Sequence, residues 1–469
     1  MTKRREFIKK SALGTAGIAI GGMGFSAKTY GSIIGANERI NVAVIGIRNQ
    51  GSSHINSWCD IKDSHNVVIK TLCDVEESLF ASRSKIVVDK TGEKPLTEWD
   101  MRKVFDDKDI TAVSIVTPNH WHALATIWAC QAGKHVYVEK PVSYTLFEGR
   151  KMVEAGAKYK VHVQHGSSPA VGEGMNFLRG GGIGDVFTAR AILFKKRDSY
   201  GMSPDSQPPA TLHYDMWVGP AAMKPYNEKK CHYNWHWYWN TGNGELGNTG
   251  PHQLHTAVIG LGKIHEHPVS VFSDGGLYGF RQDDQKTPGV RVYGDVEAYD
   301  QDKTSQETPN TQTCIFKYSD GKTLVHDTRG RYTNYEGKNN TADGNLFYGT
   351  QGYMEYSGAW KAFRKWEKEP FAGAGIGEKK VTSGRGSERV NLFTNFLDVI
   401  RSGKGEDLIN PIIGGHYSNS LIHLGNISYR LGRSLKFNGA TEKFVNDPEA
   451  DKMLKRDSYR APYIVPDKV

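Results

Sequence analysis

The lysine of the segment KHVYVEKPVSYT, residues 134–145, places a reactive amine where the backbone is constrained. Lys140 follows an apolar, β-branched run and precedes Pro141, which disfavours a helical conformation at the preceding residue. An amine held at a strand end can project into a ligand crevice. Burial near a bound cofactor would lower the pKa of this amine and suit it to donate to an alcohol or carbonyl oxygen. A solvated surface lysine is the alternative.

A second segment, VAVIGIRNQGSSH at residues 42–54, is typical of a turn that binds dinucleotides. Gly46 and Gly51 keep the outer positions of the G-x-G-x-x-G pattern, at a strand end and a helix start, where backbone N–H groups can face a pyrophosphate. Arg48 replaces the middle glycine, which permits the closest approach. An ordinary strand-turn-helix connection therefore remains an open alternative.

A carboxylate at the end of the next apolar run supports a cofactor site. Asp74, in TLCDVEE, follows Gly51 by 23 residues. A carboxylate there can accept hydrogen bonds from the adenosine ribose and would repel a 2′-phosphate, which favours NAD over NADP. A solvated Asp74 is the alternative. The guanidinium of Arg48 keeps NADP open, because it could neutralise a phosphate.

These residues must be positioned by the elements around them. The runs INVAVIGI, NVVIKTLCD, AVSIVTP and HVYVEKP alternate with helix-length stretches, the pattern of an α/β fold with a doubly wound parallel sheet. Later segments such as VFTARAILFKKR and TQTCIFKYSDGKTLVHD are longer and alternate, which predicts a second α/β domain with a large, mainly antiparallel sheet. We therefore expect a targeting segment (1–36), a Rossmann NAD-binding domain (37–165), a second domain (166–440) and a C-terminal tail packed on the domains (441–469).

The first residues, TKRREFIKKSALGTAGIAIGGMGFSA, predict a targeting segment rather than part of the fold. They resemble a twin-arginine signal, which implies export to the periplasm, through the residues Arg4, Arg5, Phe7, Ile8 and Lys9. A membrane anchor is the alternative, although the apolar stretch is shorter than the ~20 residues of a spanning helix. The segment contributes five of the nine net positive charges. The remaining charge is too small and scattered to indicate a nucleic-acid partner.

Cysteines and histidines give little indication of a metal. The five cysteines are dispersed without a close CxxC pair, which argues against disulfides and zinc clusters and favours buried thiols. His232 and His236 have a spacing that could bind a metal on a helix, but no third ligand accompanies them, and we predict no metal site. The aromatic rings between and after them, such as Trp235, could stack on sugars or fill the core.

Four motifs in order resemble the Gfo/Idh/MocA family of sugar and polyol oxidoreductases: INVAVIGI, TPNHWH (117–122), EKP (139–141) and GELGNTGPHQLH (244–255). The segments DMWVGPA, LGNISYRLGRSLKF and RAPY resemble an exported bacterial branch. The resemblance implies a Rossmann domain and a C-terminal α/β domain whose open sheet forms one wall of the active site and often an oligomer interface. It also implies that the final helices pack back on the first domain.

The resemblance further assigns roles to residues. Lys140 would polarise the substrate oxygen and His252 would act as general acid/base, whereas Asn248 stands where the family has an aspartate and can orient a hydroxyl without taking its proton. The expected cofactor-binding residues are Gly46, Arg48, Asn49, Gly51, Asp74, Thr117, Pro118, Asn119, His122, Glu139 and Lys140. The expected substrate-binding residues are His165, Tyr233, Trp235, Trp237 and His255. Structural histidines are the alternative for His252 and His255.

Three functions are compatible with these residues. The first is a periplasmic NAD-dependent oxidoreductase that oxidises a ring hydroxyl of a sugar or glycoside, with C3 as an attractive target, and recycles a tightly held cofactor. The second is an NAD-dependent glycoside hydrolase, in which Glu245, Tyr238 or another group deprotonates C2 after transient oxidation. The third is a sugar-binding protein without turnover, favoured by Arg48 and Asn248.

Overall fold

Six short β-branched runs pair into one parallel sheet in the order β3-β2-β1-β4-β5-β6. The strands are β1 (Ile40–Ile45), β2 (Val67–Cys73), β3 (Leu96–Glu98), β4 (Ala112–Ile115), β5 (His135–Val138) and β6 (Val163–His165). Ala43 and Ile45 of β1 pack into one core, whereas Val42 and Val44 pack into another. Burial on both faces explains the nearly continuous apolar runs and confirms the predicted Rossmann sheet.

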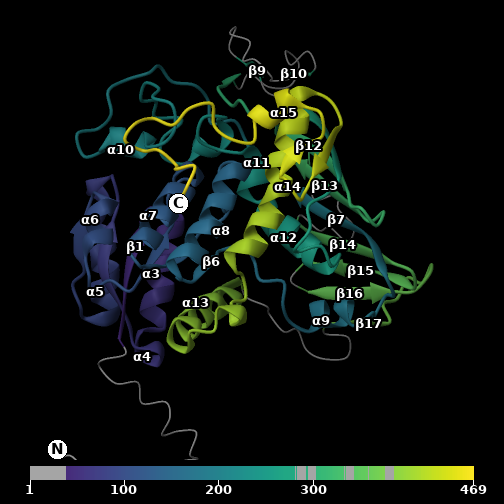
Figure 1. Ribbon diagram of the computed structural model, residues 1–469, viewed down its shortest axis with the longest axis horizontal. Helices are drawn as coiled ribbons and strands as arrows, with labels where there is room; N and C mark the ends of the chain where they lie inside the picture. The colour runs from purple at the N-terminus through teal and green to yellow at the C-terminus, as the bar shows by residue number, and fades with distance from the viewer. Residues whose placement is uncertain are drawn as a thin grey trace, which may run out of the picture. The chain divides into compact units, whose positions relative to one another are not determined.

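The computed structural model in Figure 1 describes residues 39–279, 281–282, 292–293, 303–331, 333, 343–357, 359–374 and 385–469. The predicted targeting segment, residues 1–36, lies outside this part of the chain. Within the described part, no helix combines the length and apolar character needed to cross a bilayer. All five cysteines are described, buried and free of disulfide bonds, as their spacing predicted.

Helices cover both faces of the parallel sheet. They are α3 (Asn49–Asp60), α4 (Lys62–His65), η2 (Glu77–Leu79), α5 (Phe80–Thr91), α6 (Met101–Asp106), α7 (Asn119–Gln131) and α8 (Leu146–Tyr159). Apolar residues of α6, α7 and α8 share one core, and those of α3 and α5 share the other. The start of α8 is fixed reciprocally: Thr145 accepts the N–H of Glu148, whose carboxylate accepts the N–H of Tyr144.

The second half of the chain builds a mixed, mainly antiparallel sheet in the order β17-β16-β15-β14-β7-β13-β12-β8-β18-β19, with β10 beside β8. Its strands are β7 (Val186–Phe194), β8 (Ser270–Tyr278), β10 (Val292–Tyr293), β12 (Thr311–Lys317), β13 (Thr323–Arg329), β14 (Asp343–Gly349), β15 (Gly352–Tyr356), β16 (Trp360–Phe363), β17 (Ala372–Gly373), β18 (Leu435–Asn438) and β19 (Lys443–Phe444). A separate two-stranded sheet joins β9 (Arg281–Gln282) and β11 (Lys303–Thr304). This large sheet confirms the predicted second α/β domain with its mainly antiparallel sheet.

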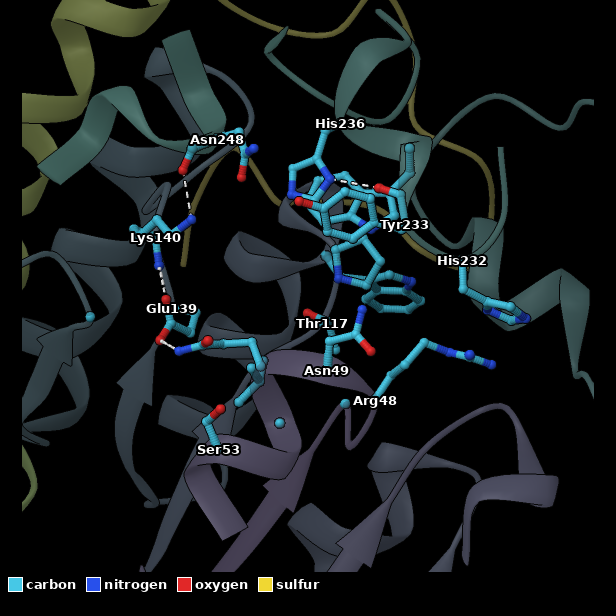
Figure 2. A pocket seen from close by; sticks show the side chains of 18 of the residues that line it. Arg48, Asn49, Ser53, Thr117, Glu139, Lys140, His232, Tyr233, His236 and Asn248 are labelled. Atoms are coloured by element: carbon cyan, nitrogen blue, oxygen red, sulfur yellow. Dashed lines mark hydrogen bonds between the residues drawn. The ribbon is translucent and has the colours of Figure 1, made fainter. Parts of the chain in front are cut away.

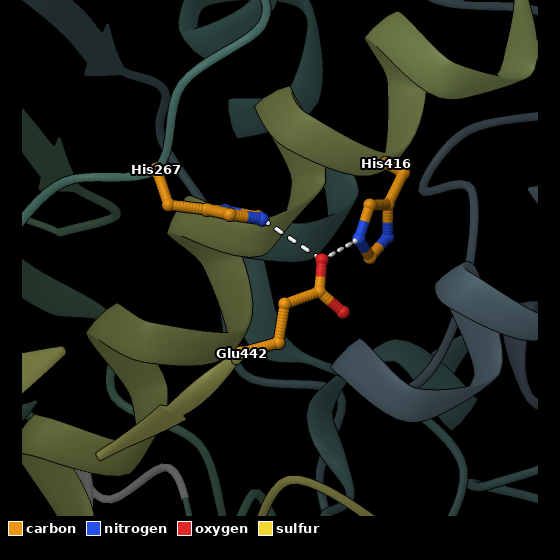
Figure 3. Close-up of side chains that lie close together, drawn as sticks. All are labelled: His267, His416 and Glu442. Atoms are coloured by element: carbon orange, nitrogen blue, oxygen red, sulfur yellow. Dashed lines mark hydrogen bonds and ion pairs between the residues drawn. The ribbon is translucent and has the colours of Figure 1, made fainter. Parts of the chain in front are cut away.

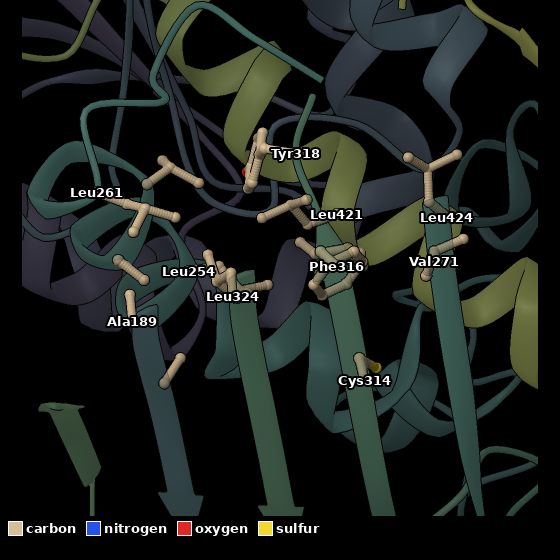
Figure 4. Packing of buried hydrophobic residues seen from close by; sticks show 14 of the residues in the cluster. Ala189, Leu254, Leu261, Val271, Cys314, Phe316, Tyr318, Leu324, Leu421 and Leu424 are labelled. Carbon is tan, nitrogen blue, oxygen red and sulfur yellow. The ribbon is translucent and has the colours of Figure 1, made fainter. Parts of the chain in front are cut away.

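One face of the large sheet is covered by helices α9 (Glu173–Arg179), α12 (Gly250–Gly260) and α14 (Ile412–Leu431). The strands alternate between buried and exposed residues, as β12 does, so that one set of side chains meets these helices. Figure 4 shows Phe316 and Leu324 of the sheet against Leu254 of α12 and Leu421 of α14. This core fixes α12, which carries His252, relative to the sheet.

The final helices return to the Rossmann domain. In α13 (Arg385–Ser402), Phe393 stacks on Tyr137 of β5 with ring centroids 4.8 Å apart and packs edge to face on Trp58 of α3. After η6 (Gly405–Asp407), α14 contacts α8. The tail beyond α15 (Pro448–Lys452) places Tyr463 against Trp121 of α7. The parallel sheet is therefore packed against segments from the end of the chain.

The segment between β7 and α12 covers the edge of the Rossmann domain near the turn that follows β1. It contains α10 (Tyr214–Val218), η3 (Asn234–Trp237) and α11 (Gly244–Asn248). His213 stacks on Trp99 with ring centroids 3.9 Å apart, and its imidazole pairs with Glu77 at 2.6 Å. This segment brings Tyr233, Trp235 and His236 to the carboxyl ends of the parallel strands.

Candidate active site

A cavity of about 550 Å³ lies between the carboxyl ends of the parallel strands and the second domain. One side, here called the Rossmann wall, consists of lining residues between Ile45 and Pro169. The opposite side, here called the second-domain wall, consists of lining residues between Lys195 and Gln253 together with Asp343. Figure 2 shows side chains of both walls directed into the same space. Ligand sites of doubly wound sheets occur at this end of the strands.

Two positions of the turn after β1 have room only for glycine. Gly46 has a φ of +87°, and a Cβ there would lie 2.6 Å from the carbonyl oxygen of Val116. A Cβ on Gly51 would lie 1.9 Å from the carbonyl oxygen of Gly46. Helix α3 follows at Asn49, so its first N–H groups lack intrahelical partners and lie beside the cavity that Asn49 and Arg48 line.

Asp74 at the end of β2 ties this turn to its neighbour. Its carboxylate accepts the N–H of Ile47 at 2.7 Å and the N–H of Glu76 at 2.9 Å. Burial raises the pKa of Asp74, and these two hydrogen bonds oppose the rise. Asp74 also lines the cavity. The residue therefore holds the turn in shape while it faces the space that a cofactor would occupy.

These features fit a dinucleotide. The hydroxyl of Thr117 lines the cavity, is buried and has no hydrogen-bond partner among the described residues. A buried hydroxyl without a partner is costly and is ordinarily satisfied by a ligand or by water. The glycine turn, the start of α3 and Asp74 supply the donors and the acceptor that a pyrophosphate and a ribose require.

Lys140 reaches the cavity from the end of β5 and is held by both domains. Its Nζ donates to the backbone carbonyl of Asn248 at 2.6 Å. The preceding Glu139 accepts the Lys140 N–H at 3.0 Å through Oε2, and accepts from Gln50 and His54 through Oε1, each at 2.8 Å. This buried carboxylate links the backbone of Lys140 to helix α3. The amine therefore has a fixed position, as the Glu-Lys-Pro context suggested.

Asn248 contributes to the site through its backbone as well as its side chain. Its amide faces the carboxylate of Glu245 at 3.4 and 3.5 Å. Glu245 also accepts two hydrogen bonds from Arg197, at 2.9 and 3.1 Å, and one from Thr249 at 2.7 Å. Burial alone would raise the pKa of Glu245, but Arg197 holds it below its usual value. Glu245 is therefore an ion-paired carboxylate that supports the second-domain wall.

His252, the expected general acid/base, lies on α12 and lines the cavity. Its Nδ1 accepts the backbone N–H of Ser168 at 2.9 Å and lies 3.1 Å from the Ser168 hydroxyl. Because Nδ1 receives an N–H, the neutral ring carries its proton on Nε2. His252 therefore offers a hydrogen-bond donor at Nε2, whereas the expected proton-accepting step requires a lone pair there.

Most of the residues expected at the site line the cavity. They are Gly46, Arg48, Asn49, Gly51, Asp74, Thr117, Pro118, Glu139, Lys140, Tyr233, Trp235, Asn248 and His252. Their individual roles stay predictions. The structure brings them together from six separate stretches of the sequence: residues 46–51, 74, 117–118, 139–140, 233–235 and 248–252.

Five other expected residues do not line the cavity, because their side chains are buried behind it. Asn119 donates to Asn243 at 2.6 Å, and the ring nitrogens of His122 lie 2.7 and 2.8 Å from the carbonyl oxygens of Pro141 and Thr117. The buried rings of His165 and His255 pack edge to face, 4.7 Å apart, and the Trp237 ring is also buried. The structure places these five side chains outside the cavity lining, and their expected roles stay predictions.

Other lining residues were not expected. They include Gln50, Ser53, Trp99, Ser167, Ser168, Lys195, Arg197, Trp217, His236, Gln253 and Asp343. Gln50 lies inside the recognised turn, and Lys195 and Arg197 follow β7 directly, so strand-end position was an available signal. Ser168, His236 and Asp343 reach the cavity only through the tertiary fold.

One group of possible metal ligands lies elsewhere in the described part of the chain (Figure 3). His267 and His416 contact the same oxygen of Glu442 through Nε2, at 3.0 and 2.7 Å. Arg150 also donates to both oxygens of that carboxylate. The fixed charge of a guanidinium opposes a divalent cation. We therefore interpret the group as a structural link between α14, α8 and the C-terminal segment.

Comparison with protein families identifies both halves of the chain. Residues 40–167 match the oxidoreductase family with an NAD-binding Rossmann fold. Residues 200–277 and 380–465 match the C-terminal α/β domain of the same family. The chain belongs to the Gfo/Idh/MocA oxidoreductase family. The cavity lies between the two matched domains of this Gfo/Idh/MocA protein and includes the glycine turn of the first.

Relatives of this Gfo/Idh/MocA protein bear two kinds of name. A Shewanella sp. (strain MR-7) protein named glycosyl hydrolase family 109 protein 1 is 23% identical over 404 residues, covering 78% of each chain. An α-N-acetylgalactosaminidase from Shewanella oneidensis is 24% identical over 265 residues, covering 52% of each chain.

Solved structures share the fold. Levoglucosan dehydrogenase in complex with NADH has a TM-score of 0.61 at 17% identity, covering 85% of this chain and 99% of the other. The WlbA dehydrogenase of Chromobacterium violaceum, with NADH and UDP-GlcNAcA, has a TM-score of 0.58 at 15% identity, covering 86% and 96%.

Proposed function

We propose that this chain is an NAD-dependent oxidoreductase that oxidises a ring hydroxyl of a sugar or glycoside to a ketone. The observation that carries the proposal is the single cavity lined by the glycine turn, Lys140, Asn248 and His252. A dinucleotide seated on the turn and a sugar seated against Lys140 would share this space. The carbohydrate names of the relatives support the substrate class.

NAD, when bound, supplies the acceptor for the two electrons that leave the substrate carbon. The chain supplies the surroundings of the substrate oxygen. Lys140, fixed by the Asn248 carbonyl, places a positive charge where an alkoxide would develop, and the Nε2–H of His252 adds a second donor. Tyr233 and Trp235 present aromatic faces that suit the C–H face of a sugar.

We infer NAD rather than NADP from Asp74, because a carboxylate at this strand end would repel a 2′-phosphate. Arg48 lies in the same part of the cavity and could pair with the pyrophosphate instead. Competition between the two cofactors in a binding titration would test this inference.

We also propose that the protein acts in the periplasm after twin-arginine export, already loaded with its cofactor. The motif at Arg4 and Arg5 supports export of a folded chain. Because no exchangeable NAD pool exists there, electrons from one substrate must return to a second substrate or to the same one. A tightly held cofactor would allow such a closed cycle, with the C3 hydroxyl of a glycoside as a chemically attractive target.

A glycoside hydrolase working by transient oxidation is the second candidate, and the names of the Shewanella relatives favour it. Neither base first considered for its elimination step lines the cavity. Glu245 is paired with Arg197, and Tyr238 is buried and hydrogen bonded to Ser305. The base at C2 would therefore have to be another group, such as Tyr233 in the second-domain wall.

The test begins with the purified mature protein. Acid denaturation should release a nicotinamide dinucleotide, which mass spectrometry would identify. Glycosides would then be incubated with the protein, with and without an added keto-sugar acceptor. A keto product that needs the acceptor supports the oxidoreductase, and free sugar without acceptor supports the hydrolase. Saturable sugar binding by protein that neither contains nor binds a dinucleotide would contradict both and indicate a binding protein.

We further propose that the mature protein is a homo-oligomer formed through the open face of the large sheet. Phe272 and Ile315 are cross-strand partners on that face, and their side chains are exposed by 43% and 41%. Exposed neighbouring apolar residues are typical of an interface. Light scattering on the mature protein would measure the oligomeric state, and a monomer would contradict this proposal.

A further inference from the structure

The imidazole of His236, on η3 in the second-domain wall, is held by the backbone in a defined tautomer. Its Nδ1 lies 2.6 Å from the carbonyl oxygen of Tyr233. A carbonyl can only accept a hydrogen bond, so Nδ1 carries the ring proton and Nε2 keeps its lone pair. This is the reverse of His252, where the Ser168 N–H occupies Nδ1 and the proton lies on Nε2.

The geometry also fixes the direction of the lone pair. The His236 ring stacks on Trp235 with centroids 3.6 Å apart and an interplanar angle of 19°. Figure 2 shows its other nitrogen turned toward the side of the cavity where Lys140 and Asn248 lie. No described residue forms a hydrogen bond with that Nε2. The cavity therefore presents one imidazole acceptor and one imidazole donor.

Burial, together with nearby positive charges, keeps His236 neutral. Burial lowers the pKa of His236 to about 3, and the positive charges of Lys140 and Arg197 act in the same direction, against the opposing effect of Glu245. A ring with so low a pKa retains its lone pair over the whole ordinary working range of pH. The acceptor at Nε2 does not depend on deprotonation near neutral pH.

We propose that His236 is a catalytic residue of the proposed sugar oxidation, accepting the hydroxyl proton at Nε2, while His252 donates a hydrogen bond to the same oxygen. This inference rests on the proposed function and deepens it. A sugar hydroxyl is both donor and acceptor, so it satisfies both rings at once. In the step, the O–H proton would pass to His236 Nε2, and the hydrogen of the C–H bond would leave with both bonding electrons, as a hydride, to oxidised NAD. The carbon gains a second bond to oxygen and becomes a ketone, while NAD is reduced by two electrons.

The loss of kcat that we expect when the base is removed follows from the weak basicity of His236. General-base catalysis contributes roughly 10²- to 10⁴-fold, and a base with a pKa well below the working pH falls at the lower end of this range. We therefore expect loss of the base to lower kcat by about 100-fold, with a smaller change in KM.

Nitrogen NMR of protein labelled with ¹⁵N-histidine tests the tautomers without turnover. The sequence has 17 histidines, so signals would be assigned by their loss in H236N and H252N variants. We expect a protonated Nδ1 and an unprotonated Nε2 for His236, and the opposite for His252. A protonated Nδ1 on His252 together with a protonated Nε2 on His236 would overturn the assignment.

Amide substitutions separate the two roles in the dinucleotide-loaded enzyme. Gln places its amide near the position of Nε2, so H252Q retains an N–H donor and should lose less than tenfold in kcat. H236Q retains an acceptor but no base, and should lose about 100-fold in kcat with KM within a few-fold of wild type. The exposed His265 provides the control, H265N, with wild-type kinetics.

The pH profile gives a third readout. An ordinary histidine base would lose kcat/KM as the pH falls through about 6.5, whereas the His236 base predicts no loss in that interval. Equal kcat for H236Q and wild type, or a larger loss in H252Q than in H236Q, would overturn this inference alone. A wild-type protein that neither binds a dinucleotide nor oxidises any glycoside would overturn the proposed function with it.

Discussion

The Rossmann wall of the cavity is shaped by a glycine turn and by backbone N–H groups, whereas the second-domain wall is built from charged and polar side chains that pair with one another. Gly46, Gly51 and Asp74 shape the first wall through close approaches and backbone N–H bonds. The Arg197–Glu245 pair shapes the second, and the Ser168–His252 bond joins the two walls. A cofactor common to many enzymes can be bound by the first kind of wall, while a particular sugar needs the second.

Lys140 belongs to the first wall but is held by the second, so its removal should have the largest effect. Lys140→Met removes the charge that would stabilise a developing alkoxide, and we expect kcat/KM to fall by about 10³-fold or more, since one such electrostatic group contributes roughly 10²- to 10³-fold and Lys140 also orients the oxygen. Steady-state kinetics on a glycoside would measure the loss. Lys85→Met, at an exposed position, is the control. Normal turnover by Lys140→Met would remove the lysine from the mechanism.

Gly51→Ala should weaken the binding of the dinucleotide by the Rossmann wall without weakening the binding of sugar by the second-domain wall. The added Cβ would lie 1.9 Å from the Gly46 carbonyl oxygen, so the turn must open. We expect dinucleotide affinity to fall by about 100-fold, which corresponds to about 2.7 kcal/mol, while sugar binding by the other wall changes little. Calorimetric titration with NAD would measure this. Gly92→Ala, at a helix end with a φ of +71°, should cost stability without changing dinucleotide affinity. Equal losses of affinity in the two variants would mean that the turn is not the binding site.

The same contrast explains what could be predicted from the sequence. The strands of the parallel sheet and the turn residues were predictable, because β-branched runs and glycine spacing are local signals. The end of α14 is also a local signal, since Gly432 follows its last residue with a φ of +69°. The strand order of the large sheet was not predictable, since β7 lies between β13 and β14, parallel to β13, through contacts distant in sequence.

The residues of the site also divide into those that local sequence signals predict and those that only the fold brings together. Gly46, Gly51, Asp74 and Lys140 were recognised from local context. The sequence shows His236 only as a partner of His232 at a metal-ligand spacing, because its position beside the Tyr233 carbonyl and near the distant Lys140 depends on the fold. The burial of the His255 ring was not predictable, because sequence spacing does not show which side chains the second domain covers.

Glu139→Gln probes the link between helix α3 and Lys140. A neutral amide cannot accept from Gln50, His54 and the Lys140 N–H as the carboxylate does. We expect about a tenfold fall in kcat/KM, or about 1.4 kcal/mol, with some loss of thermal stability because a buried network loses partners. Kinetics and a thermal unfolding curve would be compared. Wild-type kinetics in a destabilised protein would show that Glu139 serves the fold of the Rossmann wall and not the position of Lys140.

Lys195→Ala should have the smallest effect, and it tests the second-domain wall alone. Lys195 follows β7, lines the cavity, is exposed, and forms no ion pair among the described residues. An exposed charge contributes little, about 1 kcal/mol or less, so we expect KM for the sugar to rise by up to about fivefold while NAD affinity stays unchanged. The neighbouring Lys196, paired with Asp198 at 3.4 Å and absent from the cavity lining, gives the control Lys196→Ala. A change in NAD affinity in Lys195→Ala would mean that the two walls do not divide the ligands between them, because a residue of the second wall would then be holding the cofactor.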